Sequence, residues 1–103
     1  MTTETPMLFQ PLTLRGVTLP NRVVLSPLCM YSAQDGLAND WHFAHLTAFA
    51  RGGTGLVFTE ATAVRPEGRI THGCCCLWTD AQAEAYAPIA KFISDAGAVP
   101  AVQ

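Results

Sequence analysis

Histidines and cysteines are the side chains in this sequence best suited to bind a metal ion or to react as nucleophiles. Three of the four cysteines are consecutive, Cys74–Cys76, and His72 lies two residues before them. Zinc sites favour spacings such as Cys-x2-Cys, and adjacent side chains diverge, so this run does not predict a metal cluster. His42 and His45 fall about one helical turn apart, but no carboxylate or cysteine at a fitting sequence distance completes a ligand set. We therefore expect packing and hydrogen bonding from these histidines, and no metal site.

A second group of candidates follows from the predicted strands. Three short apolar runs are typical of strands in a parallel sheet, the first of them buried on both faces: Val23–Leu25, Leu56–Thr59 and Ala98–Gln103. Pro100 has no N–H, so the paired part of the last run is expected to follow it. Ligands of parallel α/β folds meet the carboxyl ends of the strands. That rule selects the segments 26–31 and 60–62 and the residue Gln103.

The remaining elements connect these strands. Leu12–Leu14 and Val17–Leu19 alternate apolar and polar residues around a turn at Arg15-Gly16, which predicts a short hairpin. Asn39 or Asp40 caps a helix that ends near Arg51 and Gly52, with a predicted apolar stripe of Trp41, Ala44, His45, Ala48 and Phe49. Thr79–Gln82 matches a capping box that begins a second helix running to Gly97. Pro88 is expected to bend that helix or to delay its start.

The predicted order is hairpin, strand, helix, strand, helix, strand, within one domain over residues 1–103. Such alternation implies an α/β fold with parallel strands, and local pattern alone does not separate a doubly wound sheet from a (β/α)8 barrel. The glycines of Gly52–Gly55 follow a helix and precede a strand. A phosphate-binding loop needs the opposite order, so this segment is a connector.

Composition narrows the class of protein. Half of the residues are hydrophobic, 14% are charged and the formal net charge is −2, which suits a packed core and provides no basic face for nucleic acid. The first residues lack the basic and apolar regions of a signal peptide, and no apolar run is long enough to span a membrane. We expect a cytoplasmic protein with reduced thiols.

Several stretches, taken together, resemble the N-terminal part of the Old Yellow Enzyme family, particularly its xenobiotic-reductase-like branch. They are Leu8-Phe9, Leu19–Val24, Ser26–Tyr31, Asp40-Trp41-His42 through Gly53, Glu60–Val64 with Pro66–Ile70, and Trp78-Thr79-Asp80. Their order and spacing match over nearly the whole chain. The resemblance implies that the chain is the N-terminal portion of a (β/α)8 TIM barrel preceded by a β-hairpin.

The resemblance also implies roles for individual residues of a flavin site. Backbone groups of Ser26, Pro27 and Leu28 would line FMN, with the Cys29 thiol near flavin N5 and O4 and the Tyr31 phenol facing the substrate. Ala61 would permit close approach of the flavin ring, and Gln103 would offer its amide to the pyrimidine edge. The plainer interpretations are that Cys29 is a small buried hydrophobe, Tyr31 a packed ring and Gln103 a surface residue. Glu60 is expected to accept structural hydrogen bonds, although it could act as a base.

The implied activity is an ene-reductase reaction. Hydride passes from NADPH or NADH to FMN, and then to the activated C=C bond of an α,β-unsaturated carbonyl compound. A complete barrel needs about 250 residues, so we expect the chain to act with a complementary polypeptide, the completed enzyme being a homo-oligomer. Two alternatives remain open: a non-catalytic α/β assembly module, and a related barrel flavoenzyme such as a dienoyl-CoA reductase with an iron–sulfur cluster.

Overall fold

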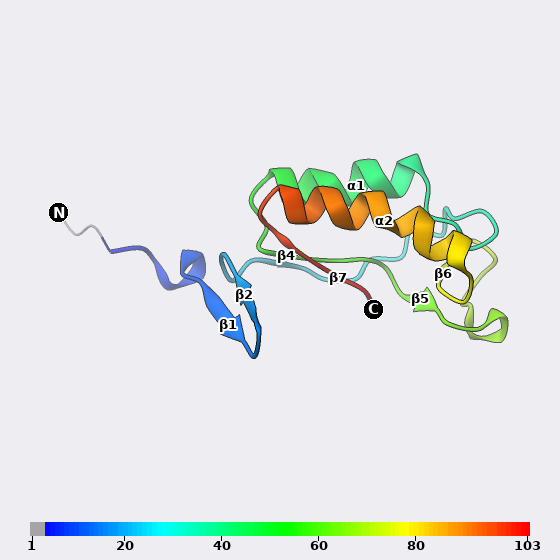
Figure 1. Ribbon diagram of the computed structural model, residues 1–103, viewed down its shortest axis with the longest axis horizontal. Helices are drawn as coiled ribbons and strands as arrows, with labels where there is room; N and C mark the ends of the chain where they lie inside the picture. Colours follow the sequence, from blue (N-terminus) through cyan, green and yellow to red (C-terminus); the bar gives the residue numbers. More distant parts are fainter. Residues whose placement is uncertain (1–3) are drawn as a thin grey trace.

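Two helices cover one face of a parallel sheet in the computed structural model, which describes residues 4–103 (Figure 1). The elements follow in the order η1 (Met7–Phe9), β1 (Leu12–Leu14), β2 (Val17–Leu19), β3 (Val24–Leu25), α1 (Asp40–Arg51), β4 (Leu56–Phe58), β5 (Thr62–Ala63), η2 (Pro66–Gly68), β6 (Cys75–Cys76), α2 (Asp80–Asp95) and β7 (Val99–Ala101). The predicted order of hairpin, strand, helix, strand, helix and strand is confirmed, with β5 and β6 as additional short strands.

The three-stranded sheet has the order β3-β4-β7, and both pairs are parallel. The prediction that pairing in the last strand follows Pro100 is wrong, because Val99 already pairs with Leu56. Val99 N–H donates to the Gly55 carbonyl, and the Ala101 carbonyl accepts from Thr59 N–H. Alternate residues of a parallel strand bond to the same neighbour, so Pro100 lies on the other edge and its missing N–H costs no bond to β4.

Helix α1 begins and ends where the sequence predicts, but it buries a different face. Asn39 is the N-cap and Gly52 the C-cap. The buried residues are His42, Leu46, Thr47 and Ala50, whereas Trp41 in the predicted apolar stripe is 63% exposed. The error arises because a histidine and a threonine occupy the inward positions, so hydrophobicity alone marks the flank of the helix.

Helix α2 begins at Asp80, directly after its capping box. Thr79 Oγ1 accepts from Gln82 N–H, and the Gln82 side chain accepts from Thr79 N–H. The expectation that Pro88 delays the start is wrong, because the helix continues through Pro88, which lies on an exposed turn. The cap satisfies backbone donors at the first turn and fixes the start independently of the proline.

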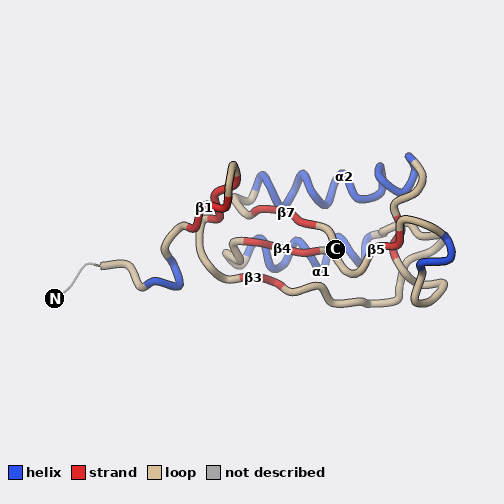
Figure 2. Tube along the Cα trace, turned by 90° about the horizontal axis from the view of Figure 1, so that it is seen from below, coloured by secondary structure: helices blue, strands red, loops and turns tan. Residues whose placement is uncertain are grey.

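The core lies between the helices and one face of the sheet. Val57, Ile89 and Ile93 are almost completely buried there, and the Phe43 and Phe92 rings pack edge-to-face with centroids 5.5 Å apart. Seen from below, the strands lie in front of both helices and no helix covers the opposite face (Figure 2). The prediction that Val23–Leu25 is buried on both faces is therefore wrong: Leu25 is buried, but Val24 is 47% exposed.

A second small sheet extends beyond the carboxyl end of β4. Strands β5 and β6 pair in parallel through Thr62↔Cys75 and Ala63↔Cys76. Gly36 lies against this sheet with φ +75°, and an added Cβ there would lie 2.6 Å from the Cβ of Cys76. Pairing between such short strands depends on tertiary packing, so neither strand was predicted. No helix within residues 4–103 is long and apolar enough to cross a membrane.

Candidate functional site

Hydrogen bonds join the carboxyl ends of the three parallel strands. The segment after β3 contacts the segment after β4 through Met30 N–H, which donates to Glu60 Oε2 at 2.8 Å. The segment after β4 contacts the chain after β7 through Thr62 N–H, which donates to the Gln103 carbonyl at 2.9 Å. These are the three segments that the sequence selected, and the structure brings them to one edge of the sheet.

The Cys29–Tyr31 segment is irregular and is packed against Gly73. Tyr31 has φ +53°, a left-handed conformation that is uncommon for an aromatic residue. Gly73 packs directly behind it, since an added Cβ at Gly73 would lie 2.4 Å from the Tyr31 carbonyl oxygen. Ala33 N–H donates to the Gly73 carbonyl at 2.9 Å. Side-chain bulk is therefore excluded behind Tyr31, and its phenol is displayed outward, with the residue 50% exposed.

Cys29 and Tyr31 form a local pair. Charge repulsion from the Cys29 thiolate, with smaller contributions from desolvation and a hydrogen bond to Cys29, raises the pKa of Tyr31. A neutral phenol at ordinary pH can donate a hydrogen bond to a carbonyl group. The pair thus presents a partly buried, polarizable thiol and an exposed hydroxyl on the same irregular segment.

Glu60 is the buried polar centre behind this edge. His42 Nε2 lies 3.0 Å from Glu60 Oε1, although the N–H is not well aligned for a hydrogen bond. The Cys75 thiol donates to the same oxygen at 2.9 Å. Burial alone would raise the pKa of Glu60, but the contacts from His42, Cys75 and Met30 outweigh it, so the pKa is lowered. The prediction that Glu60 accepts structural hydrogen bonds is confirmed.

The groups around Glu60 are held in their neutral forms. Burial, followed by the hydrogen bond to Glu60, raises the pKa of Cys75 to about 12. Burial also raises the pKa of Tyr86, whose hydroxyl lies 2.9 Å from Thr62 Oγ1. Cys75 is therefore a poor nucleophile, in contrast to the partly exposed Cys29.

Sequence spacing indicated no carboxylate or cysteine partner for His42 and His45, but the fold brings one of each to His42. His42, Glu60 and Cys75 place their ligand atoms within 4.8 Å of one another, and all three residues are buried. His45 lies apart from this cluster and packs edge-to-face on Phe49. Sequence spacing missed the cluster because its members come from α1, the end of β4 and β6. The sequence signal that could have indicated the cluster is the placement of a histidine, a glutamate and a cysteine at positions expected to be buried.

The other predicted site residues surround the strand ends with varied exposure. Pro27, Cys29 and Ala61 are partly buried, and Ser26, Leu28 and Gln103 are exposed. Within residues 4–103, no hydrogen bond uses the N–H of Leu28 or Cys29. This arrangement fits a flat heteroaromatic ligand that presents both donors and acceptors at its edge. The two N–H groups and the exposed Gln103 amide can hydrogen-bond such an edge, and the small Ala61 side chain leaves room for the ring.

Parallel strands joined by helices, with polar groups at their carboxyl ends and a hairpin ahead of the first strand, define the opening part of a (β/α)8 barrel with its ligand edge. Residues 7–103 match the NADH:flavin oxidoreductase / NADH oxidase family. The chain belongs to this family, and the resemblance stated from the sequence is confirmed.

Relatives and solved structures agree with this assignment. The chain is 50% identical over 91 residues to an NADH:flavin oxidoreductase of Gibberella zeae, a match covering 88% of this chain and 22% of that protein. It is 45% identical over 98 residues to an NADPH dehydrogenase of Bacillus pumilus, with coverages of 93% and 29%. The chain therefore spans less than a third of the length of these curated relatives.

The fold is similar to that of complete flavoenzymes. Morphinone reductase in complex with tetrahydroNAD superposes with a TM-score of 0.85 and 30% identity, covering 96% of this chain and 27% of that one. Old Yellow Enzyme from Pichia sp. gives a TM-score of 0.86 and 26% identity, with coverages of 94% and 25%. The predicted fold class, the N-terminal portion of a TIM barrel preceded by a hairpin, is confirmed.

Proposed function

We propose that this chain supplies the N-terminal flavin-contacting part of an FMN-dependent ene-reductase that oxidises NADPH or NADH and reduces the C=C bond of α,β-unsaturated carbonyl compounds. The observation that carries the proposal is the joining of three parallel strand ends by the Met30–Glu60 and Thr62–Gln103 hydrogen bonds. Family membership and the names of the relatives, which include NADPH dehydrogenases, support the redox chemistry.

The chain's own residues would bind and orient the cofactor. The N–H groups of Leu28 and Cys29, which have no partner among the described residues, would donate to the flavin. Ala61 would leave room for the ring, and Gln103 would pair with its pyrimidine edge. The bound flavin would supply the hydride chemistry, accepting from the nicotinamide and donating to the alkene. The Cys29 thiol is a weak donor and would adjust the flavin's reduction potential.

Tyr31 would act on the substrate side. Its raised pKa keeps the phenol protonated, so its O–H can hydrogen-bond the carbonyl group that activates the alkene. The left-handed φ of Tyr31 and the close approach of Gly73 to its carbonyl hold the backbone that carries this side chain. We assign Cys29 and Tyr31 as the catalytic residues carried by this chain.

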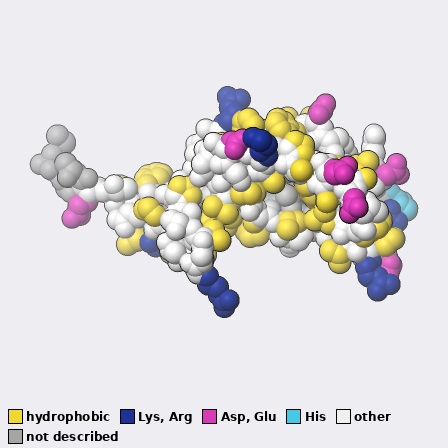
Figure 3. Space-filling model, viewed as in Figure 1, with side chains coloured by type: hydrophobic (Ala, Val, Ile, Leu, Met, Phe, Trp, Pro, Cys, Tyr) yellow, Lys and Arg dark blue, Asp and Glu magenta, His cyan; other side chains and the backbone are white. Residues whose placement is uncertain are grey.

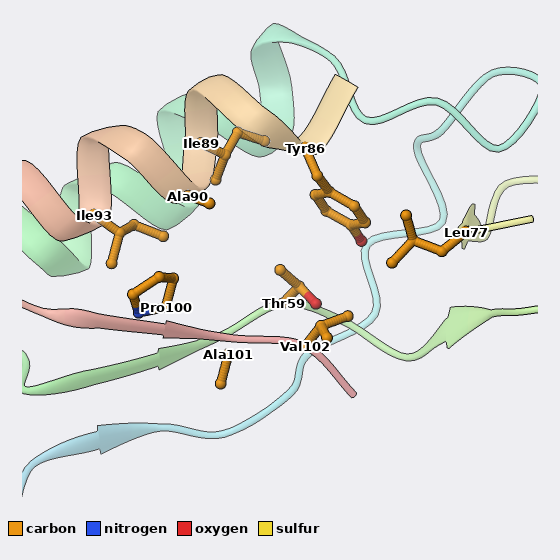
Figure 4. Close-up of a pocket in the computed structure, with 9 residues that line it drawn as sticks. All are labelled: Thr59, Leu77, Tyr86, Ile89, Ala90, Ile93, Pro100, Ala101 and Val102. Carbon is orange, nitrogen blue, oxygen red and sulfur yellow. The ribbon is translucent and has the colours of Figure 1, made fainter. Parts of the chain in front are cut away.

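Activity also requires the remaining strands of the barrel, which we propose dock beside α2 and β7. An apolar groove of about 240 Å³ opens between α2 and β7 and is lined by Tyr86, Ile89, Ala90, Ile93, Pro100 and Val102, among others (Figure 4). Hydrophobic side chains are also spread over the middle of this face of the molecule, with charged ones mainly toward its rim (Figure 3). An exposed apolar edge of this kind fits a further strand and helix.

Reconstitution tests the proposal. The chain is co-expressed with a polypeptide carrying the rest of the barrel, and the purified complex is examined for flavin absorbance and for NADPH oxidation with an enone such as cyclohexenone. We expect a yellow, active complex. A colourless but stable complex would favour the non-catalytic assembly module, and an isolated chain that binds FMN as a folded monomer would refute the need for a partner.

A variant pair tests the site itself. Replacing Ala61 with Leu would place a branched side chain where we expect the flavin ring. The FMN affinity of the reconstituted complex should therefore fall by about tenfold or more, as measured by flavin fluorescence quenching. Ala44→Leu on the exposed side of α1 is the control and should leave FMN affinity unchanged. Equal affinity in the two variants would contradict the placement of the flavin at the end of β4.

A further inference from the structure

Three different ligand atoms converge in the core behind the strand ends. His42 contributes Nε2 from α1, Glu60 contributes Oε1 from the end of β4, and Cys75 contributes Sγ from β6. Glu60 Oε1 is 3.0 Å from Nε2 and 2.9 Å from Sγ. The three residues are 1%, 4% and 0% exposed. These ligand atoms are therefore closer together, and more deeply buried, than the carboxylates and imidazoles scattered over a solvated surface.

We infer that His42, Glu60 and Cys75 form a zinc-binding site. Imidazole nitrogen, carboxylate oxygen and thiolate sulfur are the three donor types that zinc takes in proteins, and three protein ligands leave a fourth position open. A thiolate and an imidazole do not suit Mg²⁺ or Ca²⁺, which prefer sets of oxygen ligands. The site therefore selects a borderline transition metal.

The charges balance on binding. One carboxylate and one thiolate together offset the two positive charges of Zn²⁺, so the loaded site would be neutral, as a buried site requires. The metal replaces the thiol proton that Cys75 now donates to Glu60 Oε1. Glu60 is already ionised and His42 binds in its neutral form, so one proton is released for each ion bound.

Asn39 provides the supporting interaction that a ligating histidine needs. In the metal-free protein His42 Nδ1 accepts from Asn39 N–H at 3.1 Å, which leaves the ring proton on Nε2. That Nε2–H has no well-aligned acceptor within residues 4–103. When Nε2 binds the metal the proton moves to Nδ1, which lies 3.2 Å from Asn39 Oδ1 and can donate to it. The Asn39 side chain can therefore accept from the metal-bound tautomer and orient the ring, while Asn39 N–H gives up its bond to Nδ1.

Only one of the three consecutive cysteines, Cys75, belongs to the proposed site. Cys76 donates to the Cys74 carbonyl at 3.4 Å, and Cys74 Sγ accepts from Thr71 N–H at 3.2 Å. Only Cys75 of the three approaches His42 and Glu60. A bound ion would thus have one sulfur ligand and would tie α1, β4 and β6 together next to Met30, whose N–H is held by Glu60 Oε2.

X-ray absorption at the zinc edge tests the inference on the unaltered protein. The full chain, or its complex with the rest of the barrel, is loaded with one equivalent of Zn²⁺ and dialysed. We expect one sulfur at about 2.3 Å and nitrogen or oxygen ligands at about 2.0–2.1 Å. Two or more sulfur ligands would mean adventitious capture by the cysteine run and would overturn the assignment, as would loss of the ion on dialysis.

A matched pair of buried cysteines provides the second test. Cys75→Val should abolish the thiolate-to-cobalt charge-transfer absorption given by Co²⁺, and should abolish the rise in melting temperature given by Zn²⁺. Cys76→Ala should retain both, because Cys76 is equally buried but is not a ligand. Calorimetry of the unaltered protein in buffers of different ionisation enthalpy should show release of one proton. Retention of both metal effects in Cys75→Val would overturn the inference, as would the absence of metal binding in the unaltered protein.

Discussion

At the residue scale, Glu60 accepts from Met30 N–H and from the Cys75 thiol, and the Nε2–H of His42 lies close to Oε1 without good alignment. A glutamine at this position must turn its NH₂ group toward one of them, which leaves two donors facing each other in the core. We expect Glu60→Gln to lower the free energy of unfolding at neutral pH by about 1–3 kcal/mol. Urea denaturation followed by tryptophan fluorescence measures this change.

An exposed carboxylate is the control for that variant. Glu67 pairs with Arg65 on the surface, where both side chains are mostly exposed, so Glu67→Gln should change the stability by less than about 0.5 kcal/mol. If the two variants were equally stable, the buried contacts of Glu60 would contribute nothing measurable.

The same residue predicts an acid dependence of stability. The pKa of Glu60 is lowered in the folded protein, so the unfolded chain takes up a proton first as the pH falls. The contribution of Glu60 is complete above the unfolded pKa of about 4.3 and is lost as the pH falls through the folded pKa. Between pH 6 and pH 3, unfolding free energies should decline more steeply for the natural chain than for Glu60→Gln. Parallel declines would contradict this assignment.

Gly73 allows the close backbone packing at Tyr31 by its lack of a side chain. A Cβ at Gly73 would approach the Tyr31 carbonyl oxygen to 2.4 Å, and backbone atoms cannot move aside cheaply. Gly73→Ala should therefore destabilise the protein by about 1–3 kcal/mol. At Gly16 an added Cβ meets nothing within 4 Å, so Gly16→Ala should be neutral or slightly stabilising. Thermal unfolding of both variants by circular dichroism decides the matter, and similar melting temperatures would disprove the close packing.

At the element scale, the start of α2 depends on its cap. Thr79 Oγ1 accepts from the N–H of Gln82, and the Gln82 side-chain oxygen accepts from the N–H of Thr79. The Gln82 side-chain NH₂ also donates to the Asp35 carbonyl. We expect Thr79→Ala to cost about 0.5–2 kcal/mol in the free energy of unfolding. Thr79→Ser keeps the hydroxyl and should restore most of the loss. A serine variant as unstable as the alanine variant would show that the methyl group, and not the cap, matters.

Elements defined by local signals were predictable from the sequence. The hairpin turn, both helix starts and the alternation of strands and helices follow from capping residues, turn residues and short apolar runs. The inward face of α1 was not predictable, because two polar residues lie there. His42 lies beside Glu60, which is distant in sequence, and the Thr47 hydroxyl donates to the Phe43 carbonyl. Strands β5 and β6 were missed because two-residue strands exist only through their neighbours.

The candidate site, like the fold, was predictable from the sequence only in part. Its position at the strand ends follows from the order of elements, since parallel strands bring their carboxyl ends to one edge. The roles of Cys29, Ala61 and Gln103 came from family resemblance and stay predictions. The cluster of His42, Glu60 and Cys75 joins residues separated by up to 33 positions, and no spacing rule links them.

At the scale of the whole molecule, the groove beside α2 is where we expect the rest of the barrel to dock. Ala90 lines the groove and is exposed in this chain, whereas Ala87, three residues earlier on the same helix, is exposed but outside it. Ala90→Glu would place an unpaired carboxylate in the interface, where burying it is costly. We expect this variant to keep the stability of the isolated chain, to lose binding of a polypeptide that carries the rest of the barrel, and therefore to stay colourless with FMN. Ala87→Glu should assemble normally. Size-exclusion chromatography with flavin absorbance compares the two, and normal assembly of Ala90→Glu would show that the complementary strands dock elsewhere.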